Sequence, residues 1–258
     1  LGWAVHVCTD DDPALADRLA EGLADRAWAK RTVQLPPMRS VQEALDEVKA
    51  SPWRRLGPVT LVDVDDIVGA GAPGGNTHIV RALAANDRGL KAYVPVHDPA
   101  LLAEAWEAPP RARRRVVLRG SPGYGMPEVE LEARVGDKAE TDLGRIARLD
   151  AGSFHVAVGE RAPLPIHPKF WRAIGLDPRR ADLIVQKNFF HYRIFYAAIS
   201  FSHLPVVSDG ATSLERVRRR EYVVPSYPKD DVAEWRAHDP VLRAASFGRA
   251  PVDSRDQA

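Results

Sequence analysis

The sequence predicts an α/β protein built on an open, mostly parallel sheet flanked by helices, with a small antiparallel β subdomain inserted into it. One observation is the stretch Thr60 to Thr77, TLVDVDDIVGAGAPGGNT, which passes from a buried apolar strand through a glycine-rich loop to residues that can cap a helix. The other is a change in the periodicity of apolar residues along the chain. Apolar and polar residues alternate between about Arg113 and Pro165, whereas strand-like and helix-like runs alternate on both sides of that segment.

The chain begins with a predicted strand over Trp3–Thr9 and an amphipathic helix over Ala14–Lys30, which places leucines on one face at every fourth position. The alternation around Cys8 predicts a buried thiol. After a proline break, Ser40 is a predicted cap for a second helix through Val41–Val48.

Further elements follow the organising stretch in order. Before the period changes we expect a strand over Lys91–Val96 and a helix over Leu101–Trp106. The antiparallel segment contains predicted strands at Val116–Leu118, Glu128–Val135, Ile146–Leu149 and Phe154–Val158. Beyond it we expect helices over Pro168–Ile174 and Ile194–Ile199, and strands over Ala181–Val185 and Leu204–Val207.

Composition limits the classes of function. The chain has 258 residues, 28% of them charged and 45% hydrophobic, which is ordinary for a globular protein with a core. A net charge of +1 gives no electrostatic basis for binding nucleic acid, and no apolar run is long enough to span a membrane. We therefore expect neither nucleic acid nor membrane as a partner. The single cysteine favours a reducing compartment, so we expect a cytoplasmic location.

The glycine loop matches known phosphate-binding motifs only in part. Gly75 stands where a P-loop requires lysine. The dinucleotide fingerprint is matched literally by Gly69, Gly71 and Gly74, but acidic residues and the pair Ile67-Val68 separate the strand from the first glycine. A Rossmann-type dinucleotide-binding oxidoreductase is therefore kept only as a minor alternative.

Three loops follow predicted strands: Asp63–Thr77, Lys187–Arg193 and Ser208–Ser213. In open α/β sheets such loops gather at one edge, where ligands bind. Lys187, His191 and Arg193 form a basic set, in which Lys187 and His191 would share a face of a helix. These groups could hold a carboxylate or polarise a carbonyl. The alternative is that Lys187 and Arg193 only pair with the aspartates of the first loop and stabilise it.

No sequence motif indicates a metal site or a nucleophile. The HExxH pattern is absent, one cysteine excludes a thiolate cluster, and no GxSxG elbow is present. The residues alone thus predict an α/β domain with a polar cleft.

Three segments together resemble the microcystinase C (MlrC)-like metallopeptidase family. LVDVDDIVGAGAPGGNT (Leu61–Thr77) resembles the family's DxxDNPGGGAPGDGT loop, and VQKNFFHYRIF (Val185–Phe195) resembles its VKSxxHFRxxF segment. VVSDGATS (Val206–Ser213) is similar to its VDTPGxTS segment, and HPKFWRAIGLDP between them resembles DPexFralGiDP.

The resemblance implies a zinc-dependent hydrolase of peptide-like bonds whose zinc ligands belong to an N-terminal half. Residues 1–32 would then be the terminal strand and helix of that half. Residues 33–228 would be the C-terminal α/β domain, with 113–165 as its antiparallel insertion, and 229–258 a polar tail. Zinc would be the cofactor of the complete enzyme, with no ligand and no bound zinc in this chain alone. The expected partners are an N-terminal metal-binding half or second subunit and a small peptide or amide substrate, in a homo-oligomer.

The resemblance also assigns roles to residues. Lys187, His191 and Arg193 would be catalytic groups that bind a substrate carboxylate or stabilise an oxyanion. The substrate pocket would be shaped by Asp66, Gly69, Gly71, Gly74, Thr77 and Asp209.

The chain departs from the family pattern at three positions of the loop. Ile67 replaces an asparagine, Val68 a proline and Gly75 an aspartate. Two hydrogen-bonding side chains are lost from the expected site, which favours a second hypothesis: a non-catalytic binding or assembly domain with the same fold.

Overall fold

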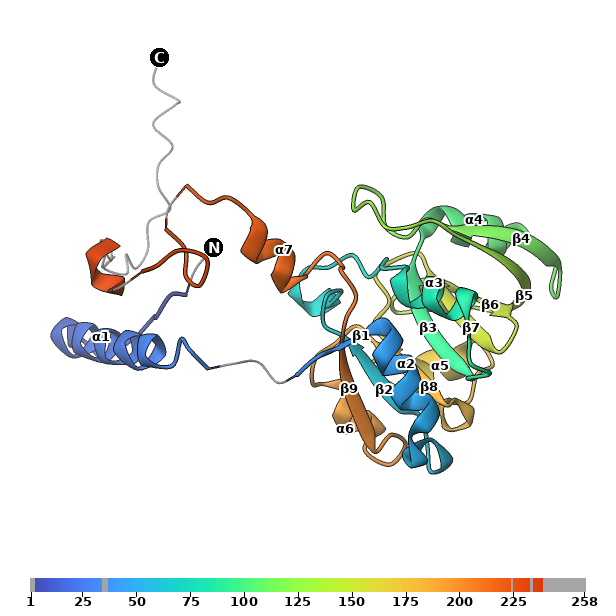
Figure 1. Cartoon of the computed structure of the whole chain (residues 1–258), viewed down its shortest axis with the longest axis horizontal. Coiled ribbons are helices and arrows are strands. Elements are labelled where there is room, and N and C mark those ends of the chain that lie inside the picture. The colour runs from blue at the N-terminus through green and yellow to red at the C-terminus, as the bar shows by residue number, and fades with distance from the viewer. Residues whose placement is uncertain (1–2, 34–36, 224, 233, 239–258) are drawn as a thin grey trace, which may run out of the picture. The chain divides into compact units, whose positions relative to one another are not determined.

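The computed structural model describes residues 3–33, 37–223, 225–232 and 234–238. The chain forms two compact units (Figure 1). Unit 1 combines residues 1–36 with residues 222–258, and unit 2 contains residues 37–221. Each is described by itself below.

Unit 2 is built on one nine-stranded sheet with the strand order β1-β9-β2-β8-β3-β7-β6-β5-β4. All neighbours from β1 to β7 are parallel, and β7, β6, β5 and β4 pair antiparallel. The strands are β1 (Arg39–Ser40), β2 (Val59–Asp63), β3 (Ala92–His97), β4 (Arg113–Leu118), β5 (Val129–Thr141), β6 (Gly144–Ala151), β7 (Phe154–Gly159), β8 (Leu183–Gln186) and β9 (Ser202–Val207).

The helices of unit 2 are short, and all but the last of them connect strands. The α-helices are α2 (Val41–Ala50), α3 (His78–Ala85), α4 (Pro99–Glu107), α5 (Lys169–Ala173), α6 (Tyr192–Tyr196) and α7 (Leu214–Arg219). Single 3-10 turns occur at η1 (Pro52–Arg55), η2 (Val68–Ala70) and η3 (Pro178–Arg180). The predicted cap of α2 is confirmed as a full capping box, in which Ser40 Oγ accepts from Glu43 N and the Glu43 carboxylate accepts from Ser40 N. Among the helices of the described ranges, none combines the length and hydropathy that crossing a membrane requires.

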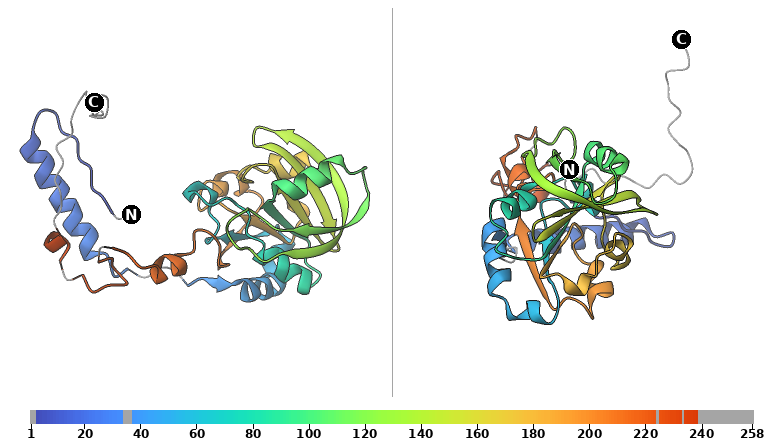
Figure 2. Two further views of the ribbon diagram at one scale, coloured as in Figure 1. Left: turned by 90° about the horizontal axis from the view of Figure 1, so that it is seen from above. Right: turned by 90° about the vertical axis from the view of Figure 1, so that its right-hand side faces the viewer.

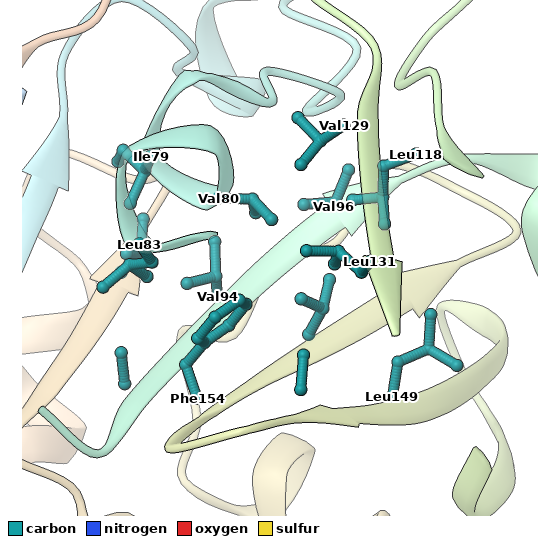
Figure 3. Packing of buried hydrophobic residues seen from close by; sticks show 14 of the residues in the cluster. Ile79, Val80, Leu83, Val94, Val96, Leu118, Val129, Leu131, Leu149 and Phe154 are labelled. Atoms are coloured by element: carbon teal, nitrogen blue, oxygen red, sulfur yellow. The ribbon is translucent and has the colours of Figure 1, made fainter. Parts of the chain in front are cut away.

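Both faces of the central parallel strands β2, β8 and β3 are covered, so that successive side chains, which point to opposite faces, enter two different cores. In β3, Val94 and Val96 join the core under α2, α3 and α4, whereas Tyr93 joins the second core under α5 and α6. Figure 2 shows α2 (blue) and the α6 region (orange) on opposite sides of the sheet. Figure 3 shows the first core, where Ile79 and Leu83 of α3 face the strands.

The antiparallel strands are confirmed, and they continue the main sheet because β7 pairs in parallel with β3. In β5 the apolar side chains Val129 and Leu131 are buried, and the intervening Glu130 and Glu132 are exposed. This alternation is typical of a sheet that is covered on one face only. The predicted α/β class, a mostly parallel sheet with an antiparallel part, is therefore correct.

Unit 1 contains the predicted first helix, α1 (Pro13–Ala29). The strand predicted over Trp3–Thr9 is wrong: these residues form no strand, and Cys8 is exposed rather than buried. Apolar alternation alone does not make a strand when no neighbouring strand pairs with the backbone N–H and C=O groups.

The C-terminal segment of unit 1 contacts α1. Arg236 donates to both carboxylate oxygens of Asp25 over 2.6 and 2.9 Å, and Trp235 Nε1 donates to the same carboxylate over 3.0 Å. Trp28 packs edge-on against Tyr227. Of the predicted polar tail, residues 235–238 form a 3-10 turn, and residues 239–258 lie outside the described residues.

Candidate functional site at the carboxyl edge of the sheet

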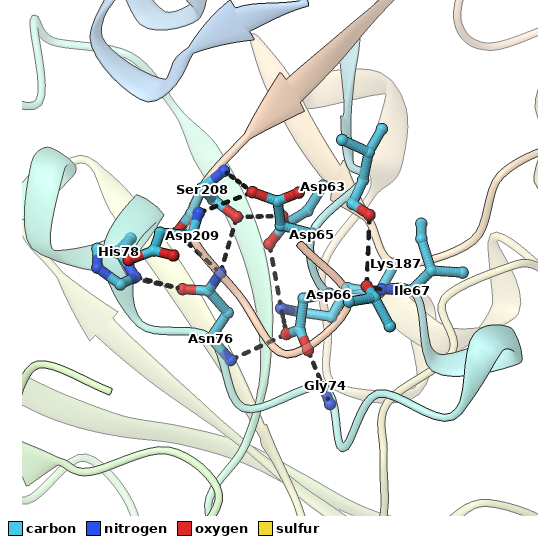
Figure 4. Close-up of polar contacts among 12 residues, drawn as sticks. Asp63, Asp65, Asp66, Ile67, Gly74, Asn76, His78, Lys187, Ser208 and Asp209 are labelled. Carbon is cyan, nitrogen blue, oxygen red and sulfur yellow. Dashed lines mark hydrogen bonds and ion pairs between the residues drawn. The ribbon is translucent and has the colours of Figure 1, made fainter. Parts of the chain in front are cut away.

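The strand order explains why the three predicted loops meet. β2 lies between β8 and β9, and all three strands run parallel. The loops that follow them therefore leave the sheet at the same edge. Polar side chains from all three loops form one connected cluster there (Figure 4).

Asp66 is the centre of this cluster. Its carboxylate forms an ion pair of 2.5 Å with Lys187 Nζ and accepts the backbone N–H groups of Gly74 (3.2 Å) and Asn76 (2.9 Å). The Asp66 carboxylate thus closes the glycine loop on itself, although 121 residues separate it from Lys187. Because that carboxylate already accepts these two N–H groups, they are not free to bind a pyrophosphate, which argues against the dinucleotide alternative.

Asp65 joins the loop after β9 to the loop after β2. Its Oδ2 accepts from the backbone N–H groups of Ser208 (2.9 Å) and Asp209 (2.8 Å). Its carbonyl oxygen accepts from Thr212 N over 2.7 Å. The Thr212 hydroxyl in turn accepts from Ile67 N over 3.0 Å. Both loops are therefore held by charge-assisted bonds inside the protein.

Asp63 is fully buried beside the same lysine. Ser208 Oγ donates to its Oδ1, and its Oδ2 lies 3.6 Å from Lys187 Nζ without a hydrogen-bond partner. Burial raises the pKa of Asp63 from 3.8 to about 6, the Lys187 ammonium opposes this increase, and the Asp66 carboxylate adds to it. One lysine is thus the counter-charge of two buried carboxyl groups.

The raised pKa of Asp63 predicts a change in pH dependence for Asp63→Asn. The proton on Asp63 stabilises the fold below its unfolded pKa of 3.8, and this contribution is lost as the pH rises through about 6. The asparagine does not titrate, so we expect the variant to gain free energy of unfolding relative to wild type as the pH rises through this range. Urea unfolding at a series of pH values measures the difference.

Asp142→Asn is the matched control for that experiment, because the Asp142 side chain is 74% exposed. Its stability should follow the wild-type pH curve. Parallel curves for Asp63→Asn and wild type would show that Asp63 does not titrate in this range.

Two glycines of the loop have backbone conformations that other residues rarely adopt. Gly71 has φ of +92° and Gly74 has φ of +78°. Gly75 is required for another reason: a Cβ atom there would lie 2.2 Å from both the backbone nitrogen and the hydroxyl of Ser121. The turn at Ser121 is itself fixed by His97, whose Nδ1 lies 2.7 Å from the Ser121 hydroxyl. These glycines thus support the shape of the loop, whereas the Cβ position of Gly69 is open.

The structure separates the predicted catalytic set. The Lys187 side chain is 1% exposed and follows strand β8 directly, whereas His191 and Arg193 are exposed at the start of α6. The expected shared helical face of Lys187 and His191 does not exist, because the helix begins only at Tyr192. The geometry favours the alternative role for Lys187, a structural ion pair with the aspartates of the first loop.

The predicted substrate-binding residues are spread along the same edge. Asp66 and Gly74 lie in the cluster, and Gly69 and Gly71 are exposed on the loop. Thr77 is buried and donates to Pro127 O over 2.6 Å. Asp209 is exposed at φ of +53° and pairs with Arg216 over 2.8 Å, which holds the pKa of this carboxyl below its ordinary value.

Ser208 and Asn76 are the members of the cluster whose roles the sequence did not reveal. Asn76 Nδ2 donates to Ser208 Oγ (2.7 Å) and Ser208 O (3.3 Å), and Asn76 Oδ1 accepts from His78. In the sequence Asn76 resembled a simple helix cap. One sequence feature could have indicated its role in the cluster: Asn76 ends the glycine loop that begins at the aspartate-rich end of the strand.

Exposed apolar side chains flank His191 and Arg193 in the sequence. Four large side chains of the same segment are exposed by 41 to 73%: Phe189, Phe190, Ile194 and Phe195. So dense a group of exposed apolar residues is typical of a surface that contacts another protein or a ligand.

The carboxylates of the cluster do not fit a metal ion. No group of three or more His, Cys, Asp or Glu side chains in the described ranges is arranged to hold one. The physical reason is visible in Figure 4, where the carboxylates of Asp63, Asp65 and Asp66 are directed at Lys187 Nζ and at N–H or O–H donors. The lysine ammonium supplies the positive charge that a cation would otherwise provide.

Comparison with known proteins gives consistent results. A family model described as the MlrC C-terminus matches residues 61–222. Microcystinase C of Sphingomonas sp. is 25% identical over 246 residues, which are 90% of this chain and 47% of that protein. A crystal structure of a metallopeptidase-like protein from Mesorhizobium sp. BNC1 has a TM-score of 0.74 and 25% identity, and the match covers 88% of this chain and 48% of that chain. The chain thus spans about half the length of these relatives.

Proposed function

Because the chain belongs to the MlrC C-terminus family, we propose that it is the C-terminal domain of a zinc metallohydrolase that acts on peptide or amide bonds. In this proposal a further half of the protein, or a second subunit, holds the zinc ion. This chain shapes the substrate side of the cleft. The likeness to a microcystinase and to a metallopeptidase-like protein, each about twice as long as the matched region, supports this division.

The observation that carries the proposal is the surface formed by residues 189–195. It offers His191 and Arg193 at the carboxyl edge of the sheet, within an exposed group of aromatic and aliphatic side chains. An imidazole and a guanidinium can bind a substrate carboxylate or a developing oxyanion, and the apolar side chains can exclude water once they are covered. We propose that the metal-binding half covers this surface, in an assembly that is a homo-oligomer.

In this arrangement Lys187 acts as a positioning residue. Its ion pairs hold the loop after β2 against strand β8, and its own backbone carbonyl accepts from Val68 N over 3.0 Å. The segment that carries His191 and Arg193 continues directly from Lys187. The buried cluster therefore fixes the position from which the exposed pair extends.

Replacing Arg193 with alanine should lower kcat/KM for hydrolysis by the complete, metal-loaded enzyme by about tenfold to a hundredfold, the effect of losing one charge-assisted hydrogen bond. Steady-state kinetics with a short peptide amide measures it. Arg179→Ala is the control: Arg179 is also exposed, but it precedes β8 and so lies at the opposite edge of the sheet. Equal kinetics for Arg193→Ala and wild type would remove the proposed role.

Elemental analysis of the chain purified alone tests the assignment of the metal. About one zinc ion per chain would contradict it, because the ligands would then lie within this sequence.

A second candidate function is a non-catalytic binding or assembly domain. Ile67 favours it: where the family has an asparagine, this side chain is apolar, buried and packed in the second core. If the complete protein assembles and holds zinc but hydrolyses no amide, and Arg193→Ala weakens assembly instead, the binding domain is the correct description.

A further inference from the structure

A cleft of about 610 Å³ opens beside the buried cluster, between α3 and α7. Its apolar lining consists of small or branched side chains, namely Val41, Ala82, Ala85 and Val207. Its polar lining carries charges of both signs, from Asp65, Asp209, Glu215, Arg81 and Arg219, together with His78. None of the residue roles assigned above uses this cleft as a whole.

The hydrogen bonds of Asn76 determine the tautomer of His78. Asn76 Nδ2 donates to Ser208, so its Oδ1 is the atom that faces His78 and can only accept. That oxygen lies 2.9 Å from both the backbone nitrogen and the Nδ1 of His78. Nδ1 therefore carries the proton, and Nε2 keeps a free lone pair. Burial also lowers the pKa of His78, which keeps the imidazole neutral near pH 7.

Helix α3 also places the cation of Arg81 in the lining of the cleft. His78 and Arg81 are three residues apart and share the face that lines the cleft. Arg81 is exposed. The opposite face of α3 is buried in the core, so this orientation is fixed by packing. The carboxylate of Asp209 also lines the cleft, close enough to influence the pKa of His78, and it is paired there with Arg216.

We propose that this cleft binds a small zwitterion, an amino acid or the end of a short peptide. Its carboxylate contacts Arg81 and its amino group donates to His78 Nε2 near Asp209. The neutral imidazole accepts from an ammonium group, whereas a protonated imidazole would repel it. The apolar lining accommodates an aliphatic side chain. The choice of a peptide as ligand rests on the proposed function, but the binding site is contained in this chain.

The test is a titration of the purified chain with glycylglycine. Long-range proton–nitrogen NMR of the histidine rings monitors each step. We expect the free chain to show the Nδ1–H tautomer at His78, and glycylglycine to shift the Nε2 signal. N-acetyl-glycylglycine lacks the ammonium group and glycylglycine amide lacks the carboxylate, so each should bind at least about tenfold more weakly. His78→Gln and Arg81→Gln should weaken binding to a similar degree, and His6→Gln, at an exposed position of unit 1, should not.

The proposal would be overturned by an Nε2–H tautomer at His78, or by equal binding of the acetylated and free dipeptides. An absence of any shift up to the solubility limit of glycylglycine would overturn it as well. Because the titration involves no hydrolysis, it can succeed even if the complete protein proves inactive, and the failure of the proposed function would then be distinguishable from the failure of this site.

Discussion

Replacing Lys187 with methionine should lower the free energy of unfolding by about 3–5 kcal/mol, the usual cost of removing one partner from a buried ion pair. Methionine retains the length and apolar stem of lysine, so the main change is the lost charge. The carboxylates of Asp63 and Asp66 would then be buried without a counter-charge. Urea unfolding monitored by circular dichroism measures the effect.

Lys169→Met is the matched control for that experiment. Lys169 pairs with Asp142 over 3.6 Å, but both side chains are more than two-thirds exposed. Such pairs contribute about 0–1 kcal/mol. If Lys187→Met cost no more than this control, the buried cluster would not be what holds the loops.

The second large effect is expected for Gly75→Asp. This substitution introduces the aspartate that the MlrC-like loop pattern has at this position. The new Cβ would lie 2.2 Å from the Ser121 backbone, and the turn of residues 120–121 would have to move. That turn is held by Asp98, whose Oδ2 accepts from Arg119 N and Gly120 N over 2.7 and 3.0 Å. We expect a loss of about 3 kcal/mol or more, at the upper end of the cost of overpacking. Differential scanning calorimetry should show it as a lower Tm.

Gly69→Asp tests whether the loss at Gly75 is specific. It introduces the same side chain in the same loop, but no atom lies within 4 Å of the Cβ position. We expect its effect to stay within about 1 kcal/mol. A comparable loss at both positions would mean that the loop rejects any carboxylate, and the contact with Ser121 would not be the reason for glycine at position 75.

Much of the fold could be predicted from the sequence because it depends on local periodicity. A few consecutive residues are enough to predict the buried strand before the glycine loop. The same holds for the strand in which Glu130 and Glu132 alternate with apolar residues. The gathering of three loops at one edge also followed, because parallel strands present their carboxyl ends together.

The parts that could not be predicted depend on strand order and on exact element boundaries. Lys187 contacts Asp66 because β2 lies between β8 and β9 in the sheet. No local sequence pattern predicts this strand order. The shared face expected for Lys187 and His191 failed because the helix begins five residues after Lys187, at Tyr192. The strand expected over Trp3–Thr9 failed because a strand needs a partner that local sequence does not specify.

The contact between Asp25 and Arg236 has a consequence for folding during synthesis. These residues are 211 positions apart, so α1 leaves the ribosome long before the segment that contacts it. Closing so long a loop costs conformational entropy, and an isolated 17-residue helix is only marginally stable in water. Unit 2, whose residues lie between the two segments, can be complete before that contact forms. We therefore expect the contact between α1 and Arg236 to form late, after unit 2 has been synthesised.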